Sequence, residues 1–151
     1  MNKRILVADD HGSIRRSLRS LLTQREDWHL CAEAVDGSDA VEKAKSMSPD
    51  VAVLDLAMDG LNGVEAAAAI RATCPNTIVL AISMYDAEPL FGRLQTVGVR
   101  GFISKNHLGT ELFRTPGPFG PSPRPVMMST QRRPALRDRA IKAASARCAS
   151  A

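Results

Sequence analysis

Five short apolar runs alternate with helical patterns along the chain, and this alternation limits the possible folds more than any other feature. The runs are "RILVA" (4–8), "WHLCAEAV" (28–35), "VAVLD" (51–55), "TIVLAIS" (77–83) and "VRGFISK" (99–105). Three of them are nearly continuous in Val, Ile, Leu and Ala, which is typical of parallel strands covered on both faces. We therefore expect five parallel strands.

Helical patterns fill the intervals between these strands, at residues 13–24, 38–47, 63–74 and 88–98. Asp36 or Ser38 is a candidate N-cap for the second helix and Asp86 for the fourth, while Gly98 is a stop signal for the fourth. Strict alternation favours an α/β fold, a doubly wound parallel sheet of the flavodoxin type with strand order 2-1-3-4-5.

Polar side chains stand where four of the strands end. Asp9 and Asp10 follow the first strand, Asp55 ends the third, Ser83 the fourth and Lys105 the fifth. In a parallel sheet of this type, ligands bind at the carboxyl ends of the strands. Three carboxylates gathered there repel one another unless a cation is present, and Mg2+ prefers such oxygen ligands. A carboxylate, a metal, a hydroxyl and an ammonium group predict a site that accepts a phosphoryl group.

Other phosphate-handling and cofactor-binding classes fit less well. A magnesium-dependent aspartyl phosphatase also uses a nucleophilic Asp after a strand, but it generally needs a second Asp two residues later, where this chain has Ala57. A "DxHxxG" loop for cobalamin and a "GxxxxGK[ST]" loop for a nucleotide are both absent from the sequence.

The segments "ILVADDH", "VAVLDLAMDGLNG", "TIVLAIS" and "VRGFISK" resemble the receiver domain of two-component response regulators, over about residues 3–112. The "DDH" opening and the Lys-Asn pair are similar to the subfamily whose receivers precede LuxR-type DNA-binding domains. The resemblance implies a cytoplasmic phosphoprotein that uses Mg2+ and takes its phosphoryl group from a histidine kinase. It implies a signalling switch rather than an enzyme, although such a phosphoacceptor assists its own phosphorylation and dephosphorylation.

The resemblance also implies the metal-binding roles. Asp55 is the expected phosphoacceptor and a metal ligand, Asp10 a direct ligand and Asp9 an indirect or water-mediated one. Ala57 is expected to offer its backbone carbonyl to the metal.

The remaining roles concern the switch. Ser83 is the expected hydroxyl that moves toward the phosphoryl group, Phe102 the aromatic side chain that packs inward with it, and Lys105 the contact to a phosphoryl oxygen. The chain departs from the family where Met58 is followed by Asp59 rather than Pro. We expect Asp59 to be a solvated surface charge, the alternative being a fourth acid that crowds the site.

The fifth helix is the larger departure. "GTELFR" (109–114) reads as its first turn, but six of the nine prolines then fall in 116–134, and proline ends helices. We expect a receiver domain over 1–112, with helix 5 truncated and no DNA-binding domain, and a mostly disordered Pro/Arg-rich tail over 113–151. The truncation would leave an apolar patch on strand 5 and helix 1 and weaken any homodimer.

The net charge of the chain changes sign at the same place. Residues 1–112 hold 12 Lys/Arg and 15 Asp/Glu, a net charge of −3, whereas residues 113–151 hold 8 and 1, a net charge of +7. The tail could bind nucleic acid non-specifically, serve as a linker or docking segment, or result from GC-rich DNA read out of frame. A truncated or degenerate receiver that acts only through protein–protein contacts also stays open. No window is apolar enough to span a membrane.

Several single residues have two interpretations. His11 could serve a metal or acid–base role, but its place where a helix begins favours a surface or cap position. Met84 and Tyr85 either gate the site or shield it, and Trp28 and Phe91 are expected to be packing residues. The three cysteines lack metal-type spacing and are expected to be reduced.

Overall fold

The computed structural model describes residues 2–85 and 88–114 of the chain. Its five strands are β1 (Lys3–Ala8), β2 (Trp28–Ala34), β3 (Val51–Asp55), β4 (Ile78–Ser83) and β5 (Val99–Ser104). They form one parallel sheet in the order β2-β1-β3-β4-β5, which confirms the predicted fold. The predicted strands match these bounds to within one residue.

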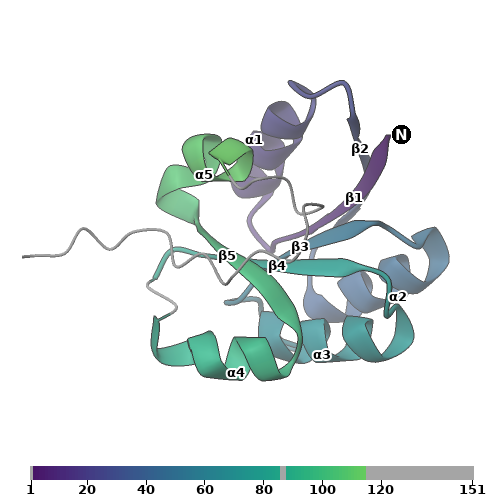
Figure 1. Ribbon diagram of the computed structural model, residues 1–151, viewed down its shortest axis with the longest axis vertical. Helices are drawn as coiled ribbons and strands as arrows, with labels where there is room; N and C mark the ends of the chain where they lie inside the picture. Colours follow the sequence, from purple (N-terminus) through teal and green to yellow (C-terminus); the bar gives the residue numbers. More distant parts are fainter. Residues whose placement is uncertain (1, 86–87, 115–151) are drawn as a thin grey trace, which may run out of the picture.

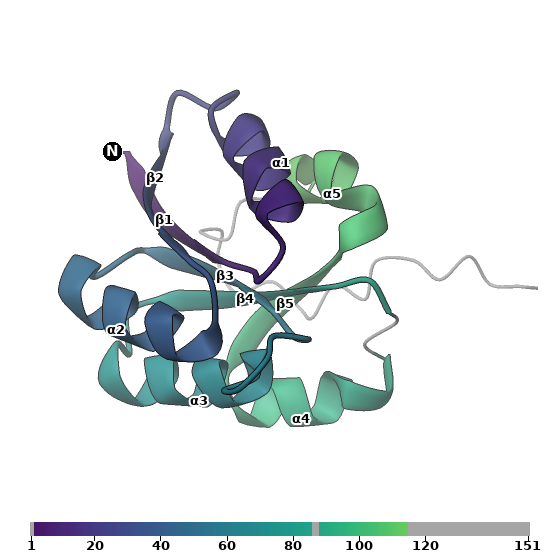
Figure 2. The ribbon, with the colours of Figure 1, turned by 180° about the vertical axis from the view of Figure 1, so that it is seen from behind.

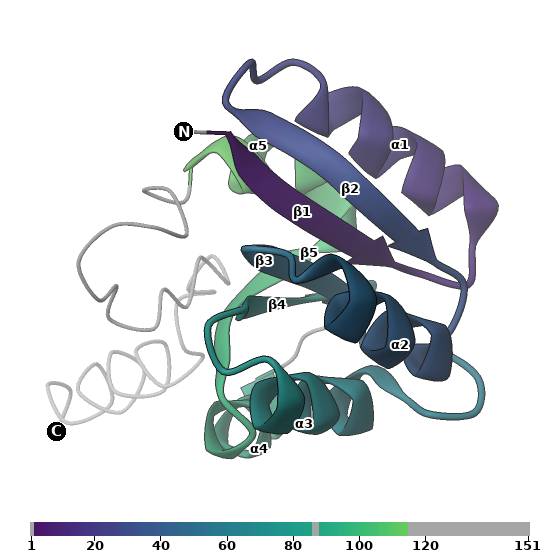
Figure 3. The same ribbon diagram turned by 90° about the vertical axis from the view of Figure 1, so that its right-hand side faces the viewer.

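Helices lie on both faces of this sheet. The α-helices are α1 (Gly12–Leu22), α2 (Gly37–Met47), α3 (Gly63–Thr73), α4 (Phe91–Thr96) and α5 (Leu108–Arg114), with short 3-10 turns η1 (Glu88–Leu90) and η2 (Lys105–His107). Figures 1 and 2 show α1 and α5 together on one face and α2, α3 and α4 on the other, and Figure 3 shows the two layers from the side.

Two hydrophobic cores result from this layering. One lies under α1 and α5 and the other, rich in alanine, under α2 and α3. Trp28 is 9% exposed and belongs to the first core, as expected of a packing residue. The side chain of Phe91 and the predicted cap Asp86 lie outside the described residues.

The helix boundaries differ from the predictions in two places. α1 ends at Leu22, where Thr23 becomes the C-cap, rather than continuing to residue 24. The predicted fourth helix divides into η1, which contains Pro89, and the six-residue α4, which begins at Phe91. Gly98 follows α4 with a φ of +82°, so the predicted stop is confirmed.

The fifth helix corrects one expectation from the sequence. α5 has seven residues, and its Leu108 and Leu112 are buried against Leu18 and Leu22 of α1. The large apolar side chains that are exposed among the described residues lie elsewhere, at Val35, Met84, Tyr85 and Leu90. Because none of these exposed side chains lies on β5 or α1, the predicted bare patch over β5 and α1 is wrong for the described residues, and Leu108 and Leu112 contribute to the core at that place. The expected tail lies outside the described residues beyond Arg114.

Candidate phosphoryl-accepting site

The predicted acids meet at the carboxyl ends of β1 and β3. Asp9 and Asp55 are almost fully buried, with 0% and 1% exposure, while Asp10 is partly exposed. Ligand atoms of Asp9, Asp10, His11 and Asp55 all lie within 4.8 Å of one another. β1 and β3 are neighbours in the sheet, and this brings residues 9–11 close to Asp55, which lies more than forty positions later in the sequence.

Lys105 enters this cluster from the end of β5. Its side chain is only 4% exposed, and its Nζ lies 2.6 Å from Asp9 Oδ2 and 3.0 Å from Asp55 Oδ2. Burial alone would lower the pKa of Lys105, but the two carboxylates more than compensate, so its pKa is raised above the ordinary value. The lysine is therefore a permanent cation beside Asp55 at neutral pH.

The carboxylate oxygens of the cluster have few cationic or hydrogen-bonding partners among the described residues. Asp9 Oδ2 and Asp55 Oδ2 are buried and both face the Lys105 ammonium group, while the buried Asp10 Oδ1 has only His11 Nδ1 at ion-pair distance among the described residues. The second oxygens of Asp9 and Asp55 accept backbone N–H groups, from His11 at 2.8 Å and Ala57 at 3.2 Å. Three clustered carboxylates with one buried lysine between two of them leave excess negative charge, which fits a further hard cation such as Mg2+.

The loop that follows Asp55 is held close to α3. An added Cβ at Gly63 would lie 2.1 Å from the backbone oxygen of Asp55 and 2.7 Å from Leu56 Cα, so only glycine permits this approach. Asn62 caps α3 by accepting the N–H groups of Val64 and Glu65. The helix start thus fixes the loop that carries Asp55.

The remaining predicted residues lie around this centre. Ser83 is 6% exposed, and its Oγ accepts the N–H of Tyr85 at 3.1 Å. Phe102 is half-buried on β5, and Ala57 is exposed. Asp59 is exposed and outside the cluster, which agrees with a solvated surface charge.

Sequence reasoning underestimated His11. Its side chain is 66% exposed, as a surface residue should be, but Nδ1 lies 2.7 Å from Asp10 Oδ1 and 3.3 Å from Asp9 Oδ1. Its place directly after two acids was the available signal. Met84 and Tyr85 are exposed beside Ser83, at 53% and 78%.

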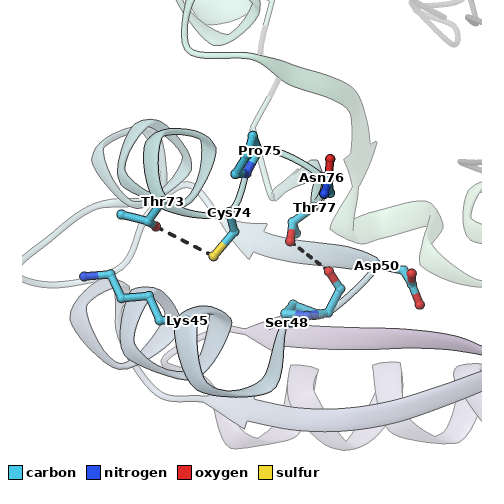
Figure 4. Close-up of a pocket in the computed structure, with 9 residues that line it drawn as sticks. Lys45, Ser48, Asp50, Thr73, Cys74, Pro75, Asn76 and Thr77 are labelled. Atoms are coloured by element: carbon cyan, nitrogen blue, oxygen red, sulfur yellow. Dashed lines mark hydrogen bonds between the residues drawn. The ribbon is translucent and has the colours of Figure 1, made fainter.

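A polar cavity of about 440 Å3 lies at the other end of the sheet. It opens between the last turns of α2 and α3, where β3 and β4 begin, and Figure 4 shows Cys74 and Thr77 among its lining residues. Thr77 donates to the Pro49 carbonyl across it at 2.8 Å. None of the clustered acids lines this cavity, so it is separate from the candidate site.

Comparisons with known proteins agree with this geometry. A sequence profile of the response regulator receiver domain matches residues 5–116. The chain belongs to the response regulator receiver family. This receiver is 36% identical over 104 residues to the oxygen regulatory protein NreC of Staphylococcus haemolyticus, a match that covers 68% of this chain and 48% of NreC. It thus spans about half the length of the curated relatives it matches.

Solved structures show the same fold. The receiver domain of the putative response regulator NarL from Mycobacterium tuberculosis superposes with a TM-score of 0.70 at 35% identity, covering 74% of this chain and 90% of that one. A two-component response regulator of the LuxR family from Aurantimonas sp. gives 0.71 at 28% identity, covering 75% and 81%. Among the described residues of this receiver, no helix is long and apolar enough to cross a bilayer.

Proposed function

We propose that this receiver is a phosphorylation-dependent switch of a two-component system, with Asp55 as the residue that accepts a phosphoryl group from a histidine kinase. The observation that carries the proposal is the state of Asp55. Its side chain is buried, and its Oδ2 is paired with the Lys105 ammonium group, 3.0 Å away. Such a carboxylate is held ionised and oriented next to a cation that can receive the charge of a phosphoryl group.

The transfer is a displacement at phosphorus. An Asp55 carboxylate oxygen forms the new P–O bond, the P–N bond to the kinase histidine breaks, and the leaving imidazole nitrogen takes its electron pair. Lys105 then contacts a phosphoryl oxygen. Ala57 stands where an aspartyl phosphatase would carry its second Asp, and its exposed methyl group cannot transfer a proton.

The acids of this site fit Mg2+. Asp10 and Asp55 would hold it directly and Asp9 indirectly or through water, with the Ala57 carbonyl as the expected further ligand. When bound, Mg2+ neutralises the charge that gathers on the transferring group. The pairing of Asp9 with both Lys105 and the His11 N–H supports an indirect role for this carboxylate.

The switch would involve Ser83 and Phe102. Ser83 Oγ already accepts one hydrogen bond, from Tyr85, and its own hydroxyl hydrogen is available for a phosphoryl oxygen. Phosphorylation would shift an existing equilibrium between two arrangements of these residues. Phe102, half-buried on β5, would move inward with Ser83.

The proposal extends to organisation and partners. A sensor histidine kinase is the expected donor and the cytoplasm the expected location of this chain, and a homodimer and non-specific nucleic-acid binding by the basic tail remain proposals. We place the end of the receiver domain near residue 112 because Leu112 of α5 belongs to the hydrophobic core under α1, and the family match ends at residue 116.

Intact mass spectrometry after incubation with acetyl phosphate tests the proposal. We expect one phosphoryl adduct on the full chain with Mg2+, and none without Mg2+ or in Asp55→Ala. The variant Asp59→Ala, which removes an exposed acid outside the cluster, should still form the adduct. Absence of an adduct on a chain that unfolds cooperatively would contradict the proposal and favour a receiver that acts only through protein contacts.

A further inference from the structure

His11 is the N-cap residue of α1, but its side chain makes no capping hydrogen bond. Instead, its Nδ1 faces the acids, at 2.7 Å from Asp10 Oδ1 and 3.3 Å from Asp9 Oδ1. The imidazole is otherwise largely exposed, so packing does not force it into this position.

The contact between His11 and Asp10 is short without being a hydrogen bond. Asp10 Oδ1 is buried and accepts no hydrogen bond within the described residues, so the ring N–H is not aligned with it. In the described part of the chain, the Lys105 ion pairs reach Asp9 and Asp55 but not Asp10. An imidazole nitrogen therefore lies within 4.8 Å of ligand oxygens of Asp9, Asp10 and Asp55, and the described lysine pairs with two of these acids but not with Asp10.

The distances suit a shared metal ion. Ligands about 2.1 Å from a divalent ion are about 3 Å apart when adjacent and about 4.2 Å apart when opposite. The separations of 2.7 and 3.3 Å bracket the first value. The four ligand atoms all lie within 4.8 Å of one another, slightly more than the separation of opposite ligands. Rotation of the exposed His11 ring can shorten the distance between its nitrogen and the carboxylate oxygens.

A nitrogen ligand changes which metal ions such a site binds most tightly. Mg2+ is a hard ion that prefers oxygen, whereas imidazole is a ligand for Zn2+, Ni2+, Cu2+ and Co2+. We propose that His11 Nδ1 is a further metal ligand, and that it increases the affinity of the acidic site for divalent transition ions such as Ni2+ relative to Mg2+. The inference rests on the metal site of the proposed function and names a residue that determines its ion specificity.

Isothermal titration of the full chain with Ni2+ and with Mg2+ tests this proposal. His11→Ala should lower the ratio of Ni2+ to Mg2+ affinity about tenfold or more, because it removes the nitrogen ligand. His29→Ala, at an exposed histidine on β2, should leave the ratio unchanged. Ni K-edge X-ray absorption should show the multiple scattering of a bound imidazole in the native chain and in His29→Ala, and lose it in His11→Ala.

Each outcome is decisive. An unchanged affinity ratio, or an imidazole signal that persists in His11→Ala, overturns the inference. Tighter binding of both ions to His11→Ala also overturns it, because the ring would then compete with metals. These results are independent of the proposed function, which fails instead if the native chain binds Mg2+ and still forms no adduct at Asp55.

Discussion

Lys105 and Asp55 form a buried ion pair between two strands that are not neighbours in the sheet: the Nζ of the lysine, at the end of β5, lies 3.0 Å from Oδ2 of the aspartate at the end of β3. The same ammonium group lies 2.6 Å from Asp9 at the end of β1. One cation thus balances two buried carboxylates, and the stability of the site depends on it.

Replacing Lys105 by Met should destabilise the chain by about 3–5 kcal/mol, because two buried carboxylates lose their shared cation. Urea denaturation measures this loss. Mg2+ should restore more stability to Lys105→Met than to the native chain, since the metal then replaces the missing charge. Lys45→Met, at an exposed lysine of α2, should change stability by less than about 0.5 kcal/mol. Equal losses in the two variants would contradict the pairing.

Gly63→Ala should destabilise the chain by about 1–3 kcal/mol or more, because its Cβ would lie 2.1 Å from a backbone oxygen that cannot give way. Gly92→Ala is the matched control. No atom lies within 4 Å of a Cβ at Gly92 in α4, so alanine should stabilise this helix by up to about 1 kcal/mol. Thermal unfolding followed by circular dichroism measures the change in stability of each variant. If both substitutions stabilised the chain, the close approach at Gly63 would be refuted.

Leu112→Ala should cost about 2–5 kcal/mol, because the leucine is 3% exposed and closes the core over Trp28 and Leu22. The same truncation at Leu90, which is 41% exposed, should cost much less. Chemical denaturation of both variants checks whether α5 is an integral part of the fold. Equal costs would show that α5 contributes little to the core.

Burial raises the pKa of the Cys31 thiol above its ordinary value of 9.0. The folded chain therefore holds this proton more tightly than the unfolded chain, and the stability that the neutral thiol contributes is lost as pH rises above about 9. Alkylation by iodoacetamide, mapped by peptide mass, should be slower at Cys31 in the folded chain than in urea at pH 8. Equal rates would contradict the shift.

The strands and the acidic cluster could be predicted from the sequence because both depend on simple periodicity. A parallel sheet places every strand end at one edge, so Asp9, Asp55 and Lys105 had to approach one another once the alternation was recognised. The choice between Asp36 and Ser38 as the cap of α2 was open. The structure selects Asp36, which accepts the Asp39 N–H at 2.8 Å, as the extended backbone at Asp36 allows.

Features that depend on tertiary contacts could not be predicted in the same way. α5 is too short to be stable by itself, and it forms because Leu108 and Leu112 fit against α1. The direction of the His11 ring is a rotamer choice that no spacing pattern encodes.

Lys105 is also the first residue of η2, which leads directly into α5. The ion pair with Asp55 is therefore made by a residue just before α5, the last described helix. A phosphoryl group on that aspartate would replace one negative charge by about two and lengthen the acidic side chain beneath the lysine. The side chain of Lys105 therefore connects Asp55, whose phosphorylation is proposed, to the segment η2–α5.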